Sequence, residues 1–587
     1  MSTPVPIIGF QVKGHPADIV KDITAKDIAG TNVVFINMPL RETAVPNTTP
    51  QGPLLMATNL RESYGVNATV IDLNAYRIKD KLAEEIGLAD GRHLSRQEAF
   101  ALIEKHFSVH GRPDLVAFSG MITTLKWQED VAKMIRQLEP NVFLVSGNGL
   151  ATELRFRSIE NIGLFTYIPE LDGIAHSEGD DIIIKIVYDA KIIKELGLEQ
   201  ALHTGKLKPY HLGEINGRQR FMYEGNRPRN LDVIPFANLN LLEEDVYGNR
   251  LLDYYLSNPV WGVSANNSSA ANFVTDKSST FVSSRGCPYA CAFCYRGAQG
   301  ERNYGMRSAQ NLAQEFELHM DKYNVDFIGM PDDNFGVSYQ RIIDLVPILK
   351  PLKMRWGTHT RLDESAGLRP GAGGKTIFED PKRIDLMAEA GCIYIGFGAE
   401  SASPKVLTTM QKGGFILKNG LEEVIVDGRP WQFPKTMLEG IKNCEYAGIH
   451  ANCTWIMAYP TETLEDVKIS VAFMKWQEEF YTSRGKSPET VNKKMFTATW
   501  YPGTEMVHHP KTKQILGEVF GLKFDQFNQP VCDENFRNYL IDLDDATKIL
   551  HDPKTGTPLN FGDLPMDDFL KVRELIDSDR TFEILNL

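Results

Sequence analysis

The sequence predicts an α/β protein in which a doubly wound parallel sheet is followed by a barrel or part-barrel of β/α units. Apolar, strand-like runs alternate with helical patterns over residues 31–149, and the alternation begins again at residue 281. A loop rich in cysteine and aromatic residues, 284–296, directly follows the first strand of the second series. These observations divide the chain into two parallel-sheet domains, the second of which carries the loop.

Length and composition narrow the class of protein. At 587 residues the chain is too long for one ordinary core, so we expect two or three domains. Hydrophobic and charged contents of 42% and 24% are those of a soluble globular protein. The net charge of −13 argues against a protein that binds nucleic acid mainly through its phosphates. Since the N-terminus resembles no signal peptide and no apolar run approaches the roughly 20 residues of a membrane helix, we expect a cytoplasmic enzyme.

The first series of elements follows an N-terminal arm. We expect strands at 31–39, 67–74, 114–120 and 141–149, and helices at 53–65, 94–111 and 126–140. Ser95 and Glu98 have the spacing of a capping box at the start of the second helix. Ligands of such sheets bind beyond the carboxyl ends of the strands, where this sequence places glycines and hydroxyls that a flat or phosphorylated ligand could approach. Ordinary tight turns explain the same residues equally well.

The second series predicts six β/α units. Strands are expected at 281–286, 325–335, 354–361, 393–401, 451–460 and 495–503, with helices between them. Polar residues collect at the carboxyl ends, which form the working face of a barrel. They are Asp332, Asp333, Asn334, Thr360, Arg361, Glu400 and Ser401. The expected organisation is an arm (1–30), a first domain (31–190), a linker (191–270), a barrel (271–510) and a small capping domain (511–587).

The cysteine loop sets Cys287, Cys291 and Cys294 in a C-x3-C-x2-C array, which indicates a metal centre. A structural zinc site needs four closed ligands, whereas only three cysteines are local and no histidine lies in the loop. A distant cysteine as fourth ligand, or a redox group of cysteines, is the weaker alternative. Three thiolates on a four-iron cluster would leave one iron open for chemistry.

This loop, with Phe293 just before its last cysteine and its place after the first barrel strand, resembles the radical S-adenosylmethionine (SAM) superfamily. The resemblance implies a (β/α)6 partial TIM barrel in which Cys287, Cys291 and Cys294 ligate a [4Fe–4S] cluster. It implies that the fourth iron chelates the amino and carboxylate groups of SAM, with Phe293 near the adenine. An external one-electron reductant of the flavodoxin or ferredoxin type would supply the electron that splits SAM into a 5′-deoxyadenosyl radical.

Other strand ends fit the same resemblance. The PDDNF sequence resembles the second-strand motif, which implies that Asp332 or Asp333 accepts from the SAM ammonium; a surface turn is the alternative. The GFGAES sequence resembles the fourth-strand motif, where Glu400 and Ser401 would reach the ribose or the carboxylate. Arg361 is the natural partner for a carboxylate because its guanidinium binds one bidentately.

A doubly wound, Rossmann-like domain directly before such a barrel resembles the cobalamin-binding radical SAM enzymes. The FSGMITT and SGNG loops resemble those that cradle cobalamin, which implies contacts at Ser119, Thr123, Ser146, Gly147 and Gly149. The D-x-H-x-x-G motif that supplies a lower axial histidine is absent, because the second strand ends in DLNAY. We therefore expect a bound cobalamin to lack a histidine ligand from this motif.

The leading hypothesis is a cobalamin-dependent radical SAM enzyme that methylates an unactivated carbon of a small molecule, lipid or peptide. A non-methylating reaction, such as the oxidative ring closure of the anaerobic magnesium-protoporphyrin ester cyclases, is the alternative. A tRNA methylthiotransferase is disfavoured because the first domain has no second set of cysteines and the tail is not basic. From another class, a non-catalytic protein could use the cluster only structurally. We expect the substrate pocket to involve the linker, the insertions 367–382 and 413–433, and the tail.

Overall fold

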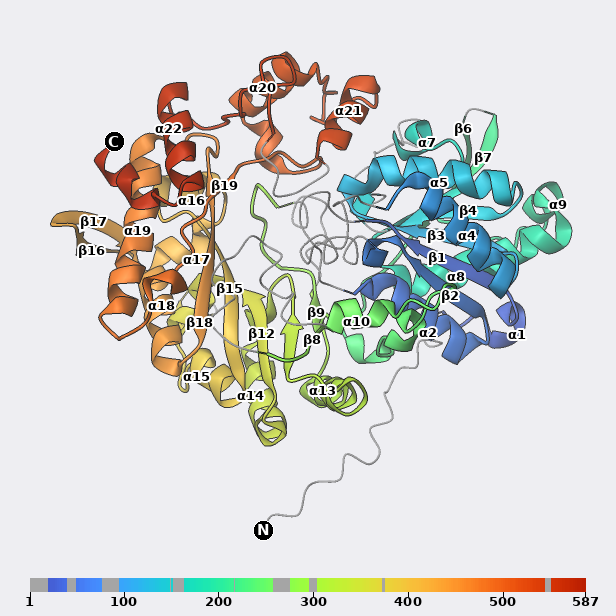
Figure 1. Cartoon of the computed structure of the whole chain (residues 1–587), viewed down its shortest axis with the longest axis horizontal. Helices are drawn as coiled ribbons and strands as arrows, with labels where there is room; N and C mark the ends of the chain where they lie inside the picture. Colours follow the sequence, from blue (N-terminus) through green and yellow to red (C-terminus); the bar gives the residue numbers. More distant parts are fainter. Residues whose placement is uncertain are drawn as a thin grey trace, which may run out of the picture. The chain divides into compact units, whose positions relative to one another are not determined.

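The fold is described from a computed structural model of the chain (Figure 1). The structure describes residues 20–39, 49–76, 94–147, 149–150, 163–215, 217–256, 275–294, 304–371, 375–543 and 550–587. Most of the predicted N-terminal arm lies outside these ranges. The chain forms two compact units, of which the first holds most of the residues up to Leu252 together with Gly305–Asn311. The second unit holds most of the remainder, which is coloured green to red in Figure 1.

A seven-stranded sheet forms the first unit, with the strand order β2-β1-β3-β4-β5-β7-β6. Its strands are β1 (Asn32–Asn37), β2 (Asn67–Asp72), β3 (Leu115–Ser119), β4 (Phe143–Gly147), β5 (Gly173–His176), β6 (His211–Ile215) and β7 (Arg218–Glu224). Neighbouring strands from β2 to β7 are parallel, and β6 is antiparallel to β7. Because the winding reverses after β2, the sheet is doubly wound, and the predicted fold class of this part is confirmed.

The hairpin β6–β7 comes from residues expected to form a linker. Phe221, Met222 and Tyr223 of β7 are buried, so the hairpin extends the core of the first sheet beyond β5. A single short apolar run among polar residues carries little periodicity, so the residue pattern does not indicate a strand here.

Helices cover both faces of the first sheet. The helices α1 (Ala25–Ile28), α2 (Gln51–Tyr64) and α8 (Gly179–Leu196) pack together, and α4 (Arg96–His110) packs on α5 (Leu125–Leu138). Ser95 and Glu98 form the predicted capping box. The unit also contains the shorter helices α7 (Gly163–Tyr167) and α9 (Leu198–His203), the first two residues of α10 (Leu251–Leu256), the 3-10 turns η2 (Ile122–Thr124), η4 (Leu231–Val233) and η5 (Leu239–Leu242), and the short strand β10 (Gly305–Met306).

Six parallel strands form the main sheet of the second unit, and they are neighbours in chain order (Figure 1). They are β8 (Ser278–Thr280), β11 (Phe327–Met330), β12 (Arg355–Thr360), β15 (Cys392–Glu400), β18 (His450–Met457) and β19 (Phe496–Thr497). Among the described residues β8 and β19 are not paired with each other, so this sheet is the predicted part-barrel.

Helices alternate with these strands as the sequence predicts. They are α13 (Ala309–Tyr323), α14 (Tyr339–Leu349), α15 (Arg383–Glu389), α16 (Pro404–Thr409), α17 (Gly413–Lys418), α18 (Lys435–Ala447) and α19 (Leu464–Thr482). The two insertions form small antiparallel hairpins, β13 (Leu368–Pro370) with β14 (Thr376–Phe378) and β16 (Leu421–Val426) with β17 (Arg429–Pro434).

The tail contains α20 (Pro510–Phe520), α21 (Glu534–Asp542), α22 (Met566–Asp577) and the 3-10 segment η13 (Thr581–Asn586). The segment η13 packs against α19, and the Asp563 N–H donates to the Glu462 carbonyl 2.7 Å away, in the loop after β18. The tail therefore contacts one of the loops at the carboxyl end of the part-barrel.

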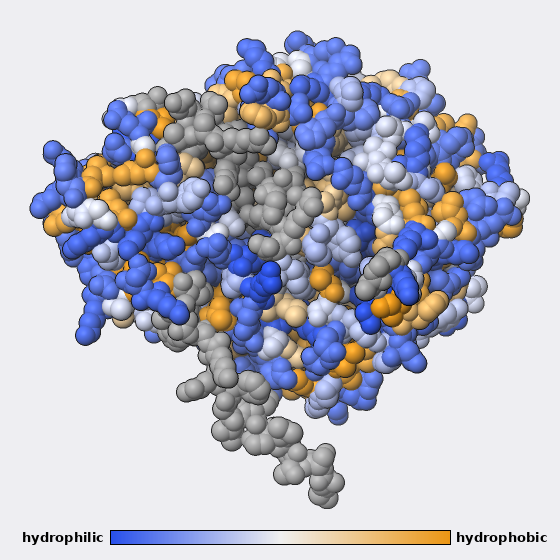
Figure 2. All heavy atoms as spheres, turned by 180° about the vertical axis from the view of Figure 1, so that it is seen from behind, coloured by the Kyte–Doolittle hydropathy of each residue, from blue (hydrophilic) through white to orange (hydrophobic). Residues whose placement is uncertain are grey.

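The face of the molecule shown in Figure 2 is mostly hydrophilic, with hydrophobic residues in small groups. Within the described ranges, no helix combines the length and the apolarity that spanning a membrane requires.

Candidate active site

The three clustered cysteines lie in the loop after β8 and the short strand β9 (Ser284–Arg285). All three are partly buried. The Ala292 N–H donates to the Met410 carbonyl at 2.9 Å, and the Ala292 carbonyl accepts from the Met506 N–H at 3.0 Å. Backbone hydrogen bonds thus hold the loop between the segments that follow α16 and β19.

The thiols of this loop fit a cluster better than a single ion. All seven cysteines lie in the described part of the chain and are thiols. Burial raises the pKa of the Cys287 thiol to about 11, so a thiolate there needs positive charge beside it. No three His, Cys, Asp or Glu side chains of the described residues are grouped closely enough to hold one metal ion. In a four-iron cluster each thiolate binds a different iron, so the three sulfurs need not converge on one point.

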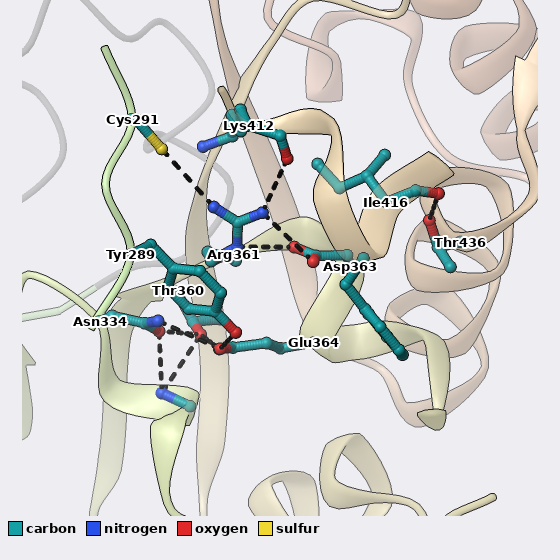
Figure 3. A network of polar contacts seen from close by, with 12 residues as sticks. Tyr289, Cys291, Asn334, Thr360, Arg361, Asp363, Glu364, Lys412, Ile416 and Thr436 are labelled. Atoms are coloured by element: carbon teal, nitrogen blue, oxygen red, sulfur yellow. Dashed lines mark hydrogen bonds and ion pairs between the residues drawn. The ribbon is translucent and has the colours of Figure 1, made fainter. Parts of the chain in front are cut away.

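Arg361, which follows β12, connects this loop to a buried polar network (Figure 3). Its Nη1 lies 3.7 Å from Cys291 Sγ, and its Nε lies 3.0 Å from Asp363 Oδ1. The Lys412 carbonyl accepts from Nη2 at 3.1 Å, and the guanidinium lies 4.1 Å from the Tyr289 ring centroid. The fork that the sequence assigns to a ligand carboxylate is therefore already paired with Asp363, and Arg361 holds a positive charge beside Cys291.

The adjacent carboxylates Asp332 and Asp333 have different surroundings. Asp332 is buried; its Oδ1 accepts from the Ser283 N–H at 2.7 Å, and its Oδ2 accepts from the hydroxyls of Ser283 and Ser284 at 2.5 and 2.6 Å. Asp333 is exposed, and its Oδ2 accepts from the Gly286 N–H at 3.0 Å. Asp332 thus fixes the start of the cysteine loop, while Asp333 presents a carboxylate to the surface of the site.

Glu400 and Phe293 face a common pocket of about 230 Å³ at the ends of β15, β18 and β19. A register irregularity at the end of β15 and a φ of 64° at Glu400 turn this residue out of the regular ladder. Lys412 Nζ lies 3.5 Å from Glu400 Oε1 and 5.9 Å from the Phe293 ring centroid. Tyr459 forms another wall, with its ring edge-on to Phe293 at 6.3 Å.

Ser401 points away from this pocket. It is fully buried, its Oγ lies 3.2 Å from Ser470 Oγ, and it accepts from the Ser403 N–H at 3.1 Å. It therefore links the end of β15 to α19. Sequence reasoning missed Lys412 and Asp363, because Asp363 lies in a short 3-10 turn (Leu362–Ala366) and Lys412 directly before α17, and no residue pattern marks either position.

The loop after β18 carries a buried carboxyl group. Glu462 is fully buried, its Oε2 accepts from the Tyr459 N–H at 3.3 Å, and its Oε1 has no hydrogen-bond partner among the described residues. Burial raises the pKa of Glu462 from 4.5 to about 8. The Glu462 carboxyl group, which accepts from the Tyr459 N–H, is therefore protonated near neutral pH.

We expect this group to make stability fall as the pH rises. Below pH 4.5 folded and unfolded chains both carry the proton, and between 4.5 and about 8 only the folded chain keeps it, so stability is lost across this window. Urea unfolding at about pH 5.5, 7 and 8.5 should show this loss, and Glu462→Gln should flatten it. Glu465→Gln, a change at an exposed residue of α19, serves as the control. Parallel pH profiles for wild type and Glu462→Gln would rule the explanation out.

In the first unit, the carboxyl ends of β1, β3 and β4 align at one sheet edge. Ser119 is in register with Asn37 on one side and with Gly147 on the other. Thr123 lies in η2, directly beyond β3, and Gly149 lies two residues beyond β4. Four of the five residues that the sequence predicts to contact a second cofactor therefore lie at the strand ends or in the segments that directly follow them along this edge.

Ser146, the fifth, turns toward helix α5. Its hydroxyl donates to Gln128 Oε1 at 2.7 Å, and Gln128 Nε2 donates to Thr124 Oγ1 at 3.1 Å. Gly120 permits this arrangement, since a Cβ there would lie 2.2 Å from Thr124 Oγ1. Ser146 thus supports the loops at this sheet edge through its hydrogen bond to Gln128 of α5.

The part-barrel and its three-cysteine loop together define a radical SAM domain, and residues 281–474 match the model of the radical SAM superfamily. This stretch of the chain therefore matches the superfamily that the cysteine loop resembles.

Similar proteins include methyltransferases. The chain is 24% identical to an uncharacterized methyltransferase of Pyrococcus horikoshii, over 82% of this chain and 84% of that protein. It is 22% identical to bacteriochlorophyllide d C-8(2)-methyltransferase of Chlorobaculum tepidum, over 47% of this chain and 56% of that protein.

Two solved structures share the fold along most of the chain. TsrM from Kitasatospora setae, a radical SAM methyltransferase with cobalamin and a [4Fe–4S] cluster bound, has a TM-score of 0.51 at 16% identity, covering 85% of this chain and 78% of that one. The cobalamin-dependent enzyme OxsB, with aqua-cobalamin and SAM bound, has a TM-score of 0.57 at 15% identity, covering 88% of this chain and 66% of that one.

Proposed function

We propose that this chain is a cobalamin-dependent radical SAM methyltransferase that methylates a carbon of a small molecule, lipid or peptide. The observation that carries the proposal is the combination, in one chain, of a three-cysteine part-barrel with a preceding doubly wound sheet. The methyltransferases among its relatives support methylation over the non-methylating ring closure. A protein of the flavodoxin or ferredoxin type would donate the electron.

Cys287, Cys291 and Cys294 would hold the [4Fe–4S] cluster. When bound, the cluster supplies the electron that cleaves SAM, and cobalamin carries the methyl group. The Arg361 guanidinium, 3.7 Å from Cys291 Sγ, offsets the negative charge that thiolates and cluster bring into a buried site. Asp332 accepts hydrogen bonds from the N–H and the hydroxyl of Ser283, so contacts within the protein fix the start of the cysteine loop.

The pocket beside Phe293 would take the nucleoside part of SAM. Its aromatic walls, Phe293 and Tyr459, suit a flat purine, and Glu400 offers a hydrogen-bond acceptor to ribose hydroxyls. Burial raises the pKa of Glu400 while Lys412 opposes the rise, so Lys412 helps Glu400 to act as an acceptor. The exposed carboxylate of Asp333 would accept from the SAM ammonium.

Cobalamin would bind at the carboxyl edge of the first sheet. Ser119, Thr123, Gly147 and Gly149 gather there, where ligands of doubly wound sheets bind. Ser146 would act indirectly, because its hydroxyl donates to Gln128.

The test uses anaerobically reconstituted protein with SAM and a strong reductant, with and without added cobalamin. We expect 5′-deoxyadenosine in both samples, because uncoupled cleavage of SAM needs no substrate, and S-adenosylhomocysteine only with cobalamin. Formation of 5′-deoxyadenosine alone would favour the non-methylating reaction, and absence of both products would contradict an enzyme of this type.

A further inference from the structure

A second pocket of the part-barrel unit, of about 480 Å³, shares a wall with the cysteine loop. Tyr289, two residues after Cys287, forms this wall. The other sides come from the first turn of α14, from the segment after β12 and from the β13 strand of the first insertion. The pocket is therefore distinct from the one that contains Phe293 and Glu400.

Arg369 of β13 places a positive charge in this pocket. Its Nε is buried, and in the described part of the chain it has neither a hydrogen-bond partner nor an ion pair. Its guanidinium lies 5.4 Å from the centroid of the Tyr339 ring, which also lines the pocket. A partly buried guanidinium without a counter-ion is unfavourable, and an anion that enters the pocket would remove this cost.

The other charged groups of the pocket already have partners. Arg383 forms an ion pair with Glu379 and donates to the Gly336 carbonyl. Glu364 accepts from the Tyr289 hydroxyl at 3.1 Å and from two further side-chain donors. Among the charged side chains that line the pocket, the Arg369 guanidinium is therefore the group that is available to bind a ligand.

The start of α14 adds groups that suit an anion. Ser338 is its N-cap, and Tyr339 and Gln340 are its first two residues; all three line the pocket. The first N–H groups of a helix have no partner within the helix, and the positive end of the helix dipole favours negative charge. A guanidinium fork beside a helix start is an arrangement that binds carboxylates and phosphates.

We propose that this pocket binds a carboxylate or phosphate group of the substrate, so that the substrate is an acidic molecule anchored by Arg369. That this anion belongs to a substrate rests on the proposed function. That the pocket binds an oxyanion is independent of the proposed function.

The experiment measures oxyanion binding to the reconstituted enzyme by isothermal titration at constant ionic strength. Inorganic phosphate is the probe in one arm and acetate in the other. We expect saturable binding in at least one arm, and the tighter arm identifies the preferred group. Arg369→Gln should weaken this binding about tenfold or more, with Arg369→Lys in between. Arg580→Gln removes the same charge from an exposed residue that pairs with Glu574, and it should leave binding unchanged.

Two results would overturn the proposal: no saturable binding of either anion by the wild type, or equal affinities for wild type and Arg369→Gln. The S-adenosylhomocysteine assay needs neither anion, so it tests the methyltransferase separately. If that assay fails while Arg369 is needed for anion binding, the anion site stands and only its role toward a methylated substrate is lost.

Discussion

Replacement of Cys291 by alanine is expected to abolish the cleavage of SAM. Two thiolates cannot hold the cluster as three do, and Arg361 Nη1 loses the sulfur that lies 3.7 Å away. We expect the iron and sulfide content to fall and 5′-deoxyadenosine formation to drop on the order of a thousandfold, as when a residue on which catalysis depends is removed. Iron and sulfide analysis, together with chromatography of the cleavage products, measures both effects.

Cys532→Ala is the matched control, because Cys532 is partly buried in the tail, away from the C-x3-C-x2-C array. It should keep both the cluster and the activity. If Cys291→Ala kept a full cluster, or if Cys532→Ala lost it equally, the assignment of the ligands would fail.

Replacement of Asp332 by alanine is expected to lower the free energy of unfolding by about 3–5 kcal/mol. The change leaves the Ser283 N–H and the hydroxyls of Ser283 and Ser284 without their acceptor in a buried site. It also removes the carboxyl group beside Arg341, whose Nη2 lies 2.9 Å from Ser283 Oγ. Urea unfolding measures the loss, and iron content reports whether the cysteine loop still forms its site.

Asp333→Ala separates a structural role from ligand binding. Asp333 is exposed, so its loss should change stability by less than about 1 kcal/mol. If Asp333 accepts from the ammonium of SAM, this variant should bind SAM more weakly while it remains folded. Equal stability of Asp332→Ala and wild type would contradict the role given to Asp332.

Local patterns in the sequence determined the main features of this protein. Cys287, Cys291 and Cys294 lie within eight residues, and their spacing indicated a metal centre. Alternating strand and helix periods predicted both parallel sheets, because periodicity reports which face of an element is buried. Since parallel strands end at one edge, the polar residues after each strand also predicted which face of the barrel carries the candidate site.

Only the tertiary structure decided which of these polar residues pair with one another. Arg361 meets Asp363 and Cys291 instead of an open carboxylate site, and Asp332 meets Ser283, 49 residues earlier in the chain. The sequence around Arg369 likewise does not reveal that this residue lines a pocket and that its Nε has no partner among the described residues. Such pairings depend on how loops from different strands pack at the barrel end, and no repeat or spacing within a single segment encodes that packing.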